Sequence, residues 1–230
     1  MLRKSPFILP SVPILAKAPP VGSEWIHEVK HDGWRAQLHK AGDDVVVFTR
    51  NGNDATRRFN SVALALAALP VESAIIDAEL VACDADGAPN FYALMGGAKH
   101  GCCAYCFDLM KFDGRSLVAT QLDERRFLLR RLMQRADRNT LRLSEVFDDT
   151  LALLAACEEQ GLEGIVSKLR GDHYSSGKNS GWIKVKTTAW RAANSERYKL
   201  FESVRAQIAT TSHESVTLGA RSPGRTPPTQ

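Results

Sequence analysis

Residues 25–35 read Trp-Ile-His-Glu-Val-Lys-His-Asp-Gly-Trp-Arg, two strand-like runs joined by an Asp-Gly turn. The pattern predicts one strand over 25–30 and a second over 34–39. Because side chains two residues apart share a face of a strand, Glu28 and Lys30 point to one side and Val29 to the other. The first strand is therefore predicted to have an apolar face for the core and a charged face that ends in a lysine.

Two later strands carry a pair of charged residues in the same way. Asp77 and Glu79 share a face of a strand predicted over 74–82. Lys184 and Lys186 have the same spacing near the end of the chain. One such pair is typical of a solvent-exposed sheet face, but three pairs favour a polar groove that the strands line together.

Strands and helices share the rest of the chain. Further strands are predicted over 45–49, 102–109, 164–168 and 182–185, and helices over 57–68, 121–136 and 149–160. Residues 1–23 are rich in proline and are predicted to form an extended arm, followed by a domain over 24–208. That domain ends in a helix with an apolar stripe of Leu200, Phe201, Val204 and Ile208, and residues 209–230 are predicted to be a disordered tail.

The composition is that of a soluble globular protein. The 230 residues are 44% hydrophobic, which allows one or two domains. No apolar run reaches the roughly 18 residues of a membrane span, and prolines interrupt the N-terminal stretch that would otherwise resemble a signal peptide. Five cysteines, an odd number in a chain of this size, favour a reducing cytoplasm, and three of them are expected in the strand at 102–109 as core residues rather than zinc ligands.

The positive charge is unevenly distributed. The formal net charge is +4, and residues 164–205 hold nine basic residues against three acidic ones. Two of the nine, Lys184 and Lys186, belong to the predicted groove. The others are candidates to meet a phosphate backbone or a partner: Lys168, Arg170, Lys178, Arg191, Arg197, Lys199 and Arg205.

Lys30 is the candidate nucleophile. A lysine amine attacks phosphorus once it has lost its proton, and positive neighbours such as Lys184 and Lys186 favour that loss. The segment Lys-His-Asp-Gly-Trp-Arg at 30–35 resembles the Lys-x-Asp-Gly-x-Arg nucleophile motif of the covalent nucleotidyltransferases, and specifically of the ATP-dependent DNA ligases. We expect no direct catalytic role for His31 or Asp32, and Asp32 shapes the turn.

Five further segments match motifs of that family in the family's order. They are Arg50-Asn51-Gly52, Asp77-Ala78-Glu79, Phe107-Asp108-Leu109, Glu163-Gly164-Ile165-Val166-Ser167-Lys168 and Trp182-Ile183-Lys184-Val185-Lys186. The segments Trp-Ile-His-Glu-Val-Lys and Phe-Asp-Leu are most similar to those of the bacterial end-joining ligases of the ligase D type. The resemblance implies an α+β fold, an ATP-grasp-like nucleotidyltransferase domain with antiparallel sheets flanked by helices.

The resemblance also implies a role for each matched residue. Lys30 would attack the α-phosphate of ATP, releasing pyrophosphate and leaving a lysyl-AMP. Glu28 would read the adenine edge and Phe107 would stack on its face, while Asp77 would be solvent-exposed or play a supporting part. Glu163 would bind Mg²⁺ or Mn²⁺. Contacts to the ribose and the phosphates would come from Arg35, Arg50, Glu79, Lys184 and Lys186.

A ligase of this kind would act in bacterial DNA repair and recombination, in the cytoplasm and in association with the nucleoid. AMP would pass from Lys30 to a 5′-phosphate at a nick or break in double-stranded DNA, and the 3′-hydroxyl would then seal the strand. Two alternatives stay open. One is a catalytically impaired module that holds nucleotide or DNA ends for a repair complex, and the other is an RNA ligase or mRNA-capping type of nucleotidyltransferase.

Two features differ from the family pattern. Ala78 stands where glycine is usual, which costs about 1 kcal/mol or more where φ is positive and nothing in an extended strand. In addition, 44 residues follow Lys186, too few for the five strands of the OB-fold that complete ligases carry. We therefore expect an adenylation domain without an OB-fold, whose place a separate DNA-binding or repair protein would take.

Overall fold

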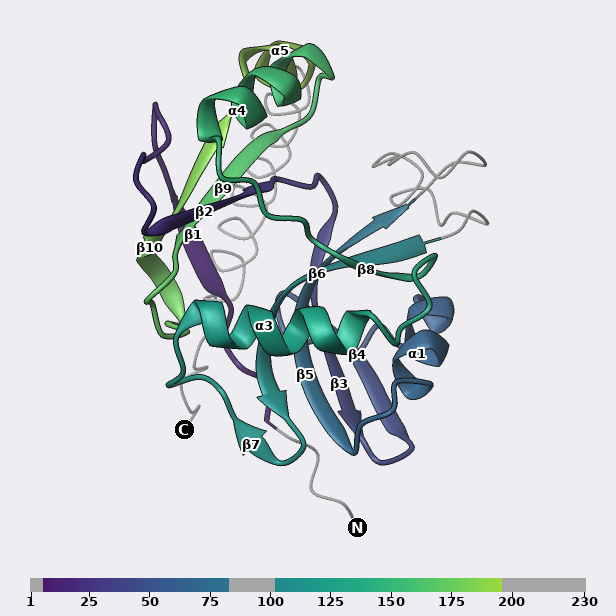
Figure 1. The fold of residues 1–230 in the computed structure, drawn as a ribbon. Helices are drawn as coiled ribbons and strands as arrows, with labels where there is room; N and C mark the ends of the chain where they lie inside the picture. The colour runs from purple at the N-terminus through teal and green to yellow at the C-terminus, as the bar shows by residue number, and fades with distance from the viewer. Residues whose placement is uncertain (1–5, 83–101, 196–230) are drawn as a thin grey trace, which may run out of the picture. The chain divides into compact units, whose positions relative to one another are not determined.

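The computed structural model describes residues 6–82 and 102–195 (Figure 1). Residues up to Trp190 belong to one compact unit, and residues 191–230 belong to a second unit, of which residues 191–195 are described. The helix expected near residues 200–208 and the tail over 209–230 therefore lie outside the described residues. Within the described part, no helix is long and apolar enough to cross a membrane.

A four-stranded sheet in the described part joins strands from distant ends of the sequence. Its order is β1 (Ser11–Leu15), β10 (Gly177–Lys186), β9 (Gly164–Leu169) and β2 (Trp25–Val29). The β2–β9 and β9–β10 pairs are antiparallel, whereas β1 runs parallel to β10. Part of the stretch expected as an extended arm is therefore an extended strand of this sheet.

A six-stranded sheet in the described part is built around a long apolar strand, β5 (Ser73–Ala82). Most of its residues are buried, because Ile76 and Ala78 on one face pack in the core with the helices, and Ile75 on the other face packs against Met110 and Trp182. Beside β5 lie β3 (Trp34–Ala41) and β6 (Cys102–Phe112), and the outer strands are β4 (Asp44–Thr49), β7 (Arg115–Ser116) and β8 (Leu141–Leu143). The pairs are antiparallel except β6–β8, so the sheets are mixed rather than purely antiparallel.

Two helices cover one face of the six-stranded sheet. α1 (Asn60–Ala67) and α3 (Leu122–Met133) bury leucines and valines against Leu38, Ile76 and Leu109 of the strands. α4 (Thr150–Glu159) packs on the other sheet, where Leu153 and Cys157 meet Ile165 and Val185. α5 (Thr188–Ala193) follows β10. The apolar spacing in the sequence predicted the first three helices to within a few residues, and β1, β7, β8 and α5 were missed because each is short.

Two glycines allow close backbone approach where the sheets meet. At Gly33 an added Cβ would collide with the carbonyl oxygen of Leu80. At Gly164, where φ is +144°, it would collide with the carbonyl oxygen of Val185. The Gly164 carbonyl also accepts a hydrogen bond from the Lys30 amide, at 2.8 Å. These contacts fix the end of β2 against β9 and β10.

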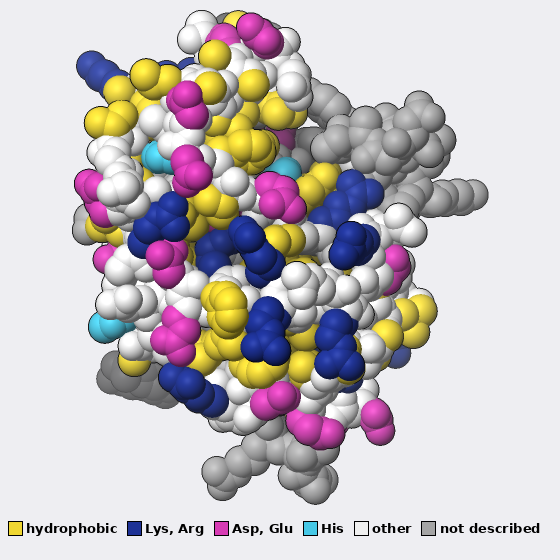
Figure 2. Space-filling view, in the orientation of Figure 1, with side chains coloured by type: hydrophobic (Ala, Val, Ile, Leu, Met, Phe, Trp, Pro, Cys, Tyr) yellow, Lys and Arg dark blue, Asp and Glu magenta, His cyan; other side chains and the backbone are white. Residues whose placement is uncertain are grey.

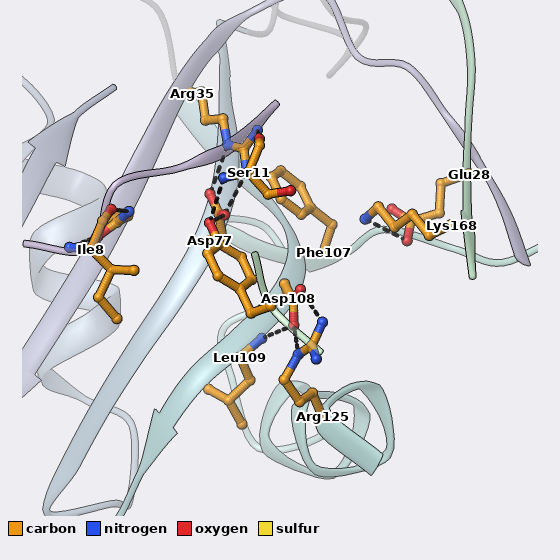
Figure 3. A network of polar contacts seen from close by, with 12 residues as sticks. Ile8, Ser11, Glu28, Arg35, Asp77, Phe107, Asp108, Leu109, Arg125 and Lys168 are labelled. Atoms are coloured by element: carbon orange, nitrogen blue, oxygen red, sulfur yellow. Dashed lines mark hydrogen bonds and ion pairs between the residues drawn. The ribbon is translucent and has the colours of Figure 1, made fainter. Parts of the chain in front are cut away.

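A fully buried ion pair fastens α3 to β6 (Figure 3). The Arg125 guanidinium donates to both oxygens of Asp108, from Nε at 2.7 Å and from Nη2 at 2.9 Å, and neither side chain has exposed surface. Nη1 donates to the carbonyl oxygens of Thr120 and Asp172. Four of the five N–H donors of the guanidinium thus meet one of these acceptors, which compensates for removing the charge from water.

We expect Arg125→Leu to lower the free energy of unfolding by about 3–5 kcal/mol, because it leaves the Asp108 carboxylate buried and unpaired. Urea unfolding followed by circular dichroism measures the change. The double variant Arg125→Leu/Asp108→Leu should recover most of the loss, and Arg130→Leu on the exposed side of the same helix should change stability by less than about 0.5 kcal/mol. A loss below about 1 kcal/mol for Arg125→Leu would show that the pair does not anchor α3.

Candidate active site

One carboxylate holds two of the lysines that the sequence singled out. The Lys30 ammonium donates to Oε2 of Glu163 at 2.6 Å, and the Lys186 ammonium lies 2.8 Å from Oε1 of the same group. Glu163 is 5% exposed, whereas Lys30 keeps 22% of its side chain open to solvent. The end of β2, the start of β9 and the end of β10 therefore meet at a single buried anion.

Lys184 adds a third positive group to this cluster. Burial lowers the pKa of Lys184, and the charges of Lys30 and Lys186 lower it further, with Arg50 contributing and Glu163 acting in the opposite sense. Arg50 itself lies exposed in the turn after β4. A region with this excess of positive charge and one carboxylate stabilises a bound anion such as a phosphate.

Glu79 is a second carboxylate near the cluster, on β5 opposite Arg35 of β3. Burial raises the pKa of Glu79 to about 7, and the charges of Glu163 and Asp77 raise it further against the opposing influence of Lys30 and Arg35. Close to neutral pH this carboxyl is therefore divided between its two forms. It can donate a hydrogen bond when protonated and accept one when ionised.

Glu28 is buried in a network that the sequence did not predict. Its Oε1 accepts hydrogen bonds from Arg126 and Lys168, each at 2.9 Å, and its Oε2 accepts one from the Ser144 hydroxyl at 2.8 Å. The prediction that Lys168 is a surface cation was wrong, since its side chain is 2% exposed. β9 pairs with β2 and places Lys168 opposite Ile26, next to Glu28, on the inner side of the sheet.

Phe107 lies in an aromatic cluster beside that network. The Lys168 ammonium lies 4.4 Å from the centre of the Phe107 ring and 4.3 Å from that of Trp182. The two rings meet edge to face, with centroids 6.1 Å apart. Phe107 and Glu28, which the sequence assigned to the two sides of one base, are thus joined through Lys168.

Arg35 and Asp77 form a further buried ion pair (Figure 3). Arg35 donates to both oxygens of Asp77, at 2.9 and 2.7 Å, and to the carbonyl oxygen of Ser11 in β1. Burial opposes the charge of Arg35, but Asp77 outweighs it and raises the pKa of the guanidinium. Tyr174 donates to Asp77 at 2.7 Å. The solvent-exposed role considered for Asp77 is wrong, because the carboxylate is fully buried and supports Arg35.

The residues that follow Lys30 are held by aromatic side chains. His31 stacks on Tyr105 with ring centroids 3.8 Å apart, and burial lowers the pKa of His31 to about 4. His31 is therefore neutral at pH 7 and adds no charge beside Lys30. Asp32 accepts a hydrogen bond from the indole of Trp190 at 3.3 Å, a contact that the sequence did not indicate. Ala78 lies in the extended strand β5, so it carries no penalty of positive φ.

Comparison with known proteins bears on this arrangement. The family model described as the ATP dependent DNA ligase domain matches residues 14–186, which run from the end of β1 to the end of β10 and include Lys30, Glu163, Lys184 and Lys186. The chain belongs to this family. The α+β fold that the resemblance implied is confirmed, because the same mixed sheets with helices occur in a solved structure of a mycobacterial DNA ligase D complexed with ATP and MES.

That ligase structure is 29% identical in sequence and superposes with a TM-score of 0.68, covering 77% of this chain and 59% of the other. The multifunctional non-homologous end joining protein LigD of Pseudomonas aeruginosa is 36% identical over 185 residues, which are 78% of this chain and 22% of that protein. A probable DNA ligase of Mycolicibacterium paratuberculosis is 33% identical over 178 residues, 72% of this chain and 34% of its own length. The chain thus spans about a fifth to a third of these curated relatives.

Basic side chains of the ligase-family domain gather over α3 and the turns that follow it (Figure 2). Arg130, Arg131, Arg135 and Arg138 are all exposed there. The nearby Asp137 carboxylate accepts from the Thr140 hydroxyl at 2.7 Å and from the Asn139 amide. Among the cations expected to meet DNA, Arg170 is 3.4 and 3.3 Å from Asp123 and Asp148. Lys178 and Arg191 are exposed, and Arg197, Lys199 and Arg205 lie outside the described residues.

The raised pKa of Glu79 predicts a pH-dependent contribution to stability. The folded state holds the proton up to about pH 7, whereas the unfolded chain loses it near 4.5, so this residue lowers the free energy of unfolding as pH rises between those values. The free energy of unfolding of the parent minus that of Glu79→Gln should fall by up to about 1.4 kcal/mol per pH unit from pH 5 to 7. Urea unfolding at pH 5, 6 and 7 measures it, with the exposed Glu145→Gln as the matched control. A difference that does not change with pH would contradict the prediction.

Proposed function

We propose that this chain is the nucleotide-transferring domain of an ATP-dependent DNA ligase that acts in DNA repair and recombination. The observation that carries the proposal is the meeting of Lys30, Lys184 and Lys186 around the Glu163 carboxylate. Family membership supports the reaction class. The name of the Pseudomonas aeruginosa relative, a non-homologous end joining protein, supports the repair role and the choice of broken or nicked double-stranded DNA as partner.

In the proposed first step Lys30 attacks the α-phosphorus of ATP. A bond forms between Nζ and phosphorus, the bond from phosphorus to the bridging oxygen breaks, and pyrophosphate leaves with that electron pair. The ammonium gives one proton to solvent before the attack, and the attacking nitrogen gives a second proton to solvent as the bond forms, so the product is a neutral phosphoramidate nitrogen bearing AMP. Lys184 and Lys186 stabilise the negative charge that builds on the phosphoryl oxygens, which is the largest contribution to this kind of catalysis.

The following two steps transfer AMP and seal the strand. An oxygen of the DNA 5′-phosphate attacks the same phosphorus, and Lys30 leaves as an amine that takes up a proton. The 3′-hydroxyl then attacks the 5′-phosphate, a phosphodiester forms and AMP departs. Both steps reuse the cations around Lys30, because negative charge again builds on the phosphoryl oxygens.

The remaining residues are proposed to hold ATP. Glu28 and Phe107 take the adenine, one at its edge and the other at its face, and their connection through Lys168 fixes the two at constant separation. Glu79 meets a ribose hydroxyl, for which a carboxyl of intermediate protonation is suited. Arg50, whose charge acts on Lys184, is proposed to contact the phosphates, and Arg35, held by Asp77, is proposed to contact the ribose.

Glu163 suits a magnesium ion that arrives with ATP. Magnesium takes one or two carboxylates together with substrate phosphates, and the described residues hold no cluster of three or more candidate ligands that would form a cage of protein groups alone. Glu163 would hold the ion, with Glu79 as the neighbouring second carboxylate, and Mn²⁺ fits the same oxygens. When bound, the ion neutralises phosphate charge. For Lys30 to attack, Glu163 has to give up its ion pair with the ammonium.

We expect the parent protein, incubated with Mg²⁺ and α-labelled ATP, to form an acid-labile AMP adduct that Lys30→Ala and Lys30→Arg abolish. Denaturing gel electrophoresis measures the label, and Lys178→Ala on exposed β10 serves as control. Labelled GTP in parallel separates this proposal from a capping-type enzyme. An unlabelled parent, or an undiminished adduct in Lys30→Ala, would refute the proposal and leave a binding module as the explanation.

The arginines at the end of α3 are proposed to contact the DNA backbone. Each phosphate contact contributes about 0.9 to the slope of log affinity against log salt concentration. We expect Arg135→Gln/Arg138→Gln to reduce that slope by about 1 to 2 for a nicked duplex, without changing AMP adduct formation. Fluorescence anisotropy between 50 and 200 mM salt measures it. Arg115→Gln/Lys17→Gln removes two exposed charges elsewhere, and an equal loss in that control would contradict the assignment.

A further inference from the structure

Trp190 contacts two parts of the candidate active site. The Lys186 ammonium lies 4.1 Å from the centre of its ring, and its indole nitrogen donates to Oδ2 of Asp32 at 3.3 Å. The side chain is 6% exposed. It lies beyond the last segment that the family pattern covers, and no motif or spacing in the sequence singles it out.

The start of α5 fixes the position of this ring. The amides of Thr188 and Ala189 both donate to the carboxylate of Glu158, each at 2.7 Å, so the end of α4 caps the helix. The Thr187 hydroxyl donates to the Leu162 carbonyl at 2.6 Å and accepts from the Trp190 amide at 3.3 Å. The backbone around Trp190 is therefore tied to the segment that leads into Glu163.

The Lys186 ammonium thus contacts a charged group, the Glu163 carboxylate, and an aromatic group, the Trp190 ring. Glu163 attracts its ammonium through charge, and the face of Trp190 attracts it through the electron density of the ring. When ATP takes the place of the carboxylate contact, the contact with the ring remains. Without the ring, the long side chain of Lys186 would populate several rotamers, and its ammonium would not keep this orientation.

We propose that Trp190 is a positioning residue for phosphoryl transfer. Its ring face holds the Lys186 ammonium toward the α-phosphate, and its indole N–H holds the Asp32 carboxylate in the turn that follows Lys30. This inference rests on the proposed function. One side chain of α5 thereby keeps a phosphate-binding cation and the nucleophile's turn at constant positions.

Substitution separates the two contacts. Trp190→Phe keeps a ring and loses the N–H, and Trp190→Leu loses both. Under single-turnover conditions with saturating ATP, we expect adduct formation to slow by about 5- to 30-fold in Trp190→Leu and by less than about threefold in Trp190→Phe. A rate within twofold of the parent for Trp190→Leu would overturn the proposal. Equal slowing in both variants would overturn the part assigned to the ring face.

A series of fluorinated tryptophans at position 190 tests the ring contact without the structural defect that Trp190→Leu could cause. Fluorine withdraws electron density from the ring face with little change of shape, so the adenylation rate should fall stepwise as fluorines are added. The same series at Trp25, on the face of β2 opposite Glu28, is the matched control. A rate that is independent of fluorine number at position 190 would overturn the proposal, even where Trp190→Leu fails to fold.

NMR of the lysine side chains gives a readout that needs no catalysis. The methylene protons of Lys186 beside the Trp190 ring should be shifted upfield in the parent and in Trp190→Phe, and should return to ordinary lysine values in Trp190→Leu. The absence of an upfield shift in the parent would refute the contact itself. A parent that shows the shift but forms no AMP adduct would refute the proposed function while leaving the contact established.

Discussion

Lys30, Lys184 and Lys186 lie in one sheet at positions where their ammonium groups repel one another, and Glu163 lies between two of them. That single carboxylate determines much of the local backbone. Its own strand has to approach β2 and β10 closely, which Gly164 makes possible, and its carbonyl receives the Thr187 amide. The fold therefore holds a repulsive set of charges close together, an arrangement that favours a bound anion because an anion would reduce the repulsion.

Buried ion pairs connect this cluster to the rest of the molecule. Glu28 is held by Arg126 from α3 and by Lys168 from β9, so one carboxylate links the helix layer of one sheet to a strand of the other. Arg35 of β3 and Asp77 of β5 pair within the six-stranded sheet, and Arg35 also donates to the Ser11 carbonyl of β1 in the four-stranded sheet. Such pairs add little net stability over apolar residues of the same size. They do require specific partners, which gives the candidate active site a defined geometry.

The sequence was informative wherever a spacing rule applied. The two-residue alternation predicted that Glu28 and Lys30 share one face of a strand, and that Lys184 and Lys186 share another. In the structure Lys30 and Lys186 both contact Glu163. The sequence did not predict the position of charged residues that are buried, because such residue types are usually found at the surface. Arg125 and Arg126 look like solvent-facing residues of an amphipathic helix, and Lys168 like a surface cation, yet all three are buried. Their carboxylate partners are distant in the chain, so no local pattern reveals them. Strand β1 and helix α5 were missed because they are short and stabilised by tertiary contacts.

The four-stranded sheet has a consequence for the order of synthesis. β1 and β2 are made early, but they pair with β9 and β10, and the ion pair between Lys30 and Glu163 joins residues 133 positions apart. Contacts of such long range form slowly, because a large loop must close before they contribute. A nascent chain on the ribosome therefore carries Lys30 long before it carries the charged groups that surround it. The charge cluster around Glu163 is complete only once translation has passed Lys186.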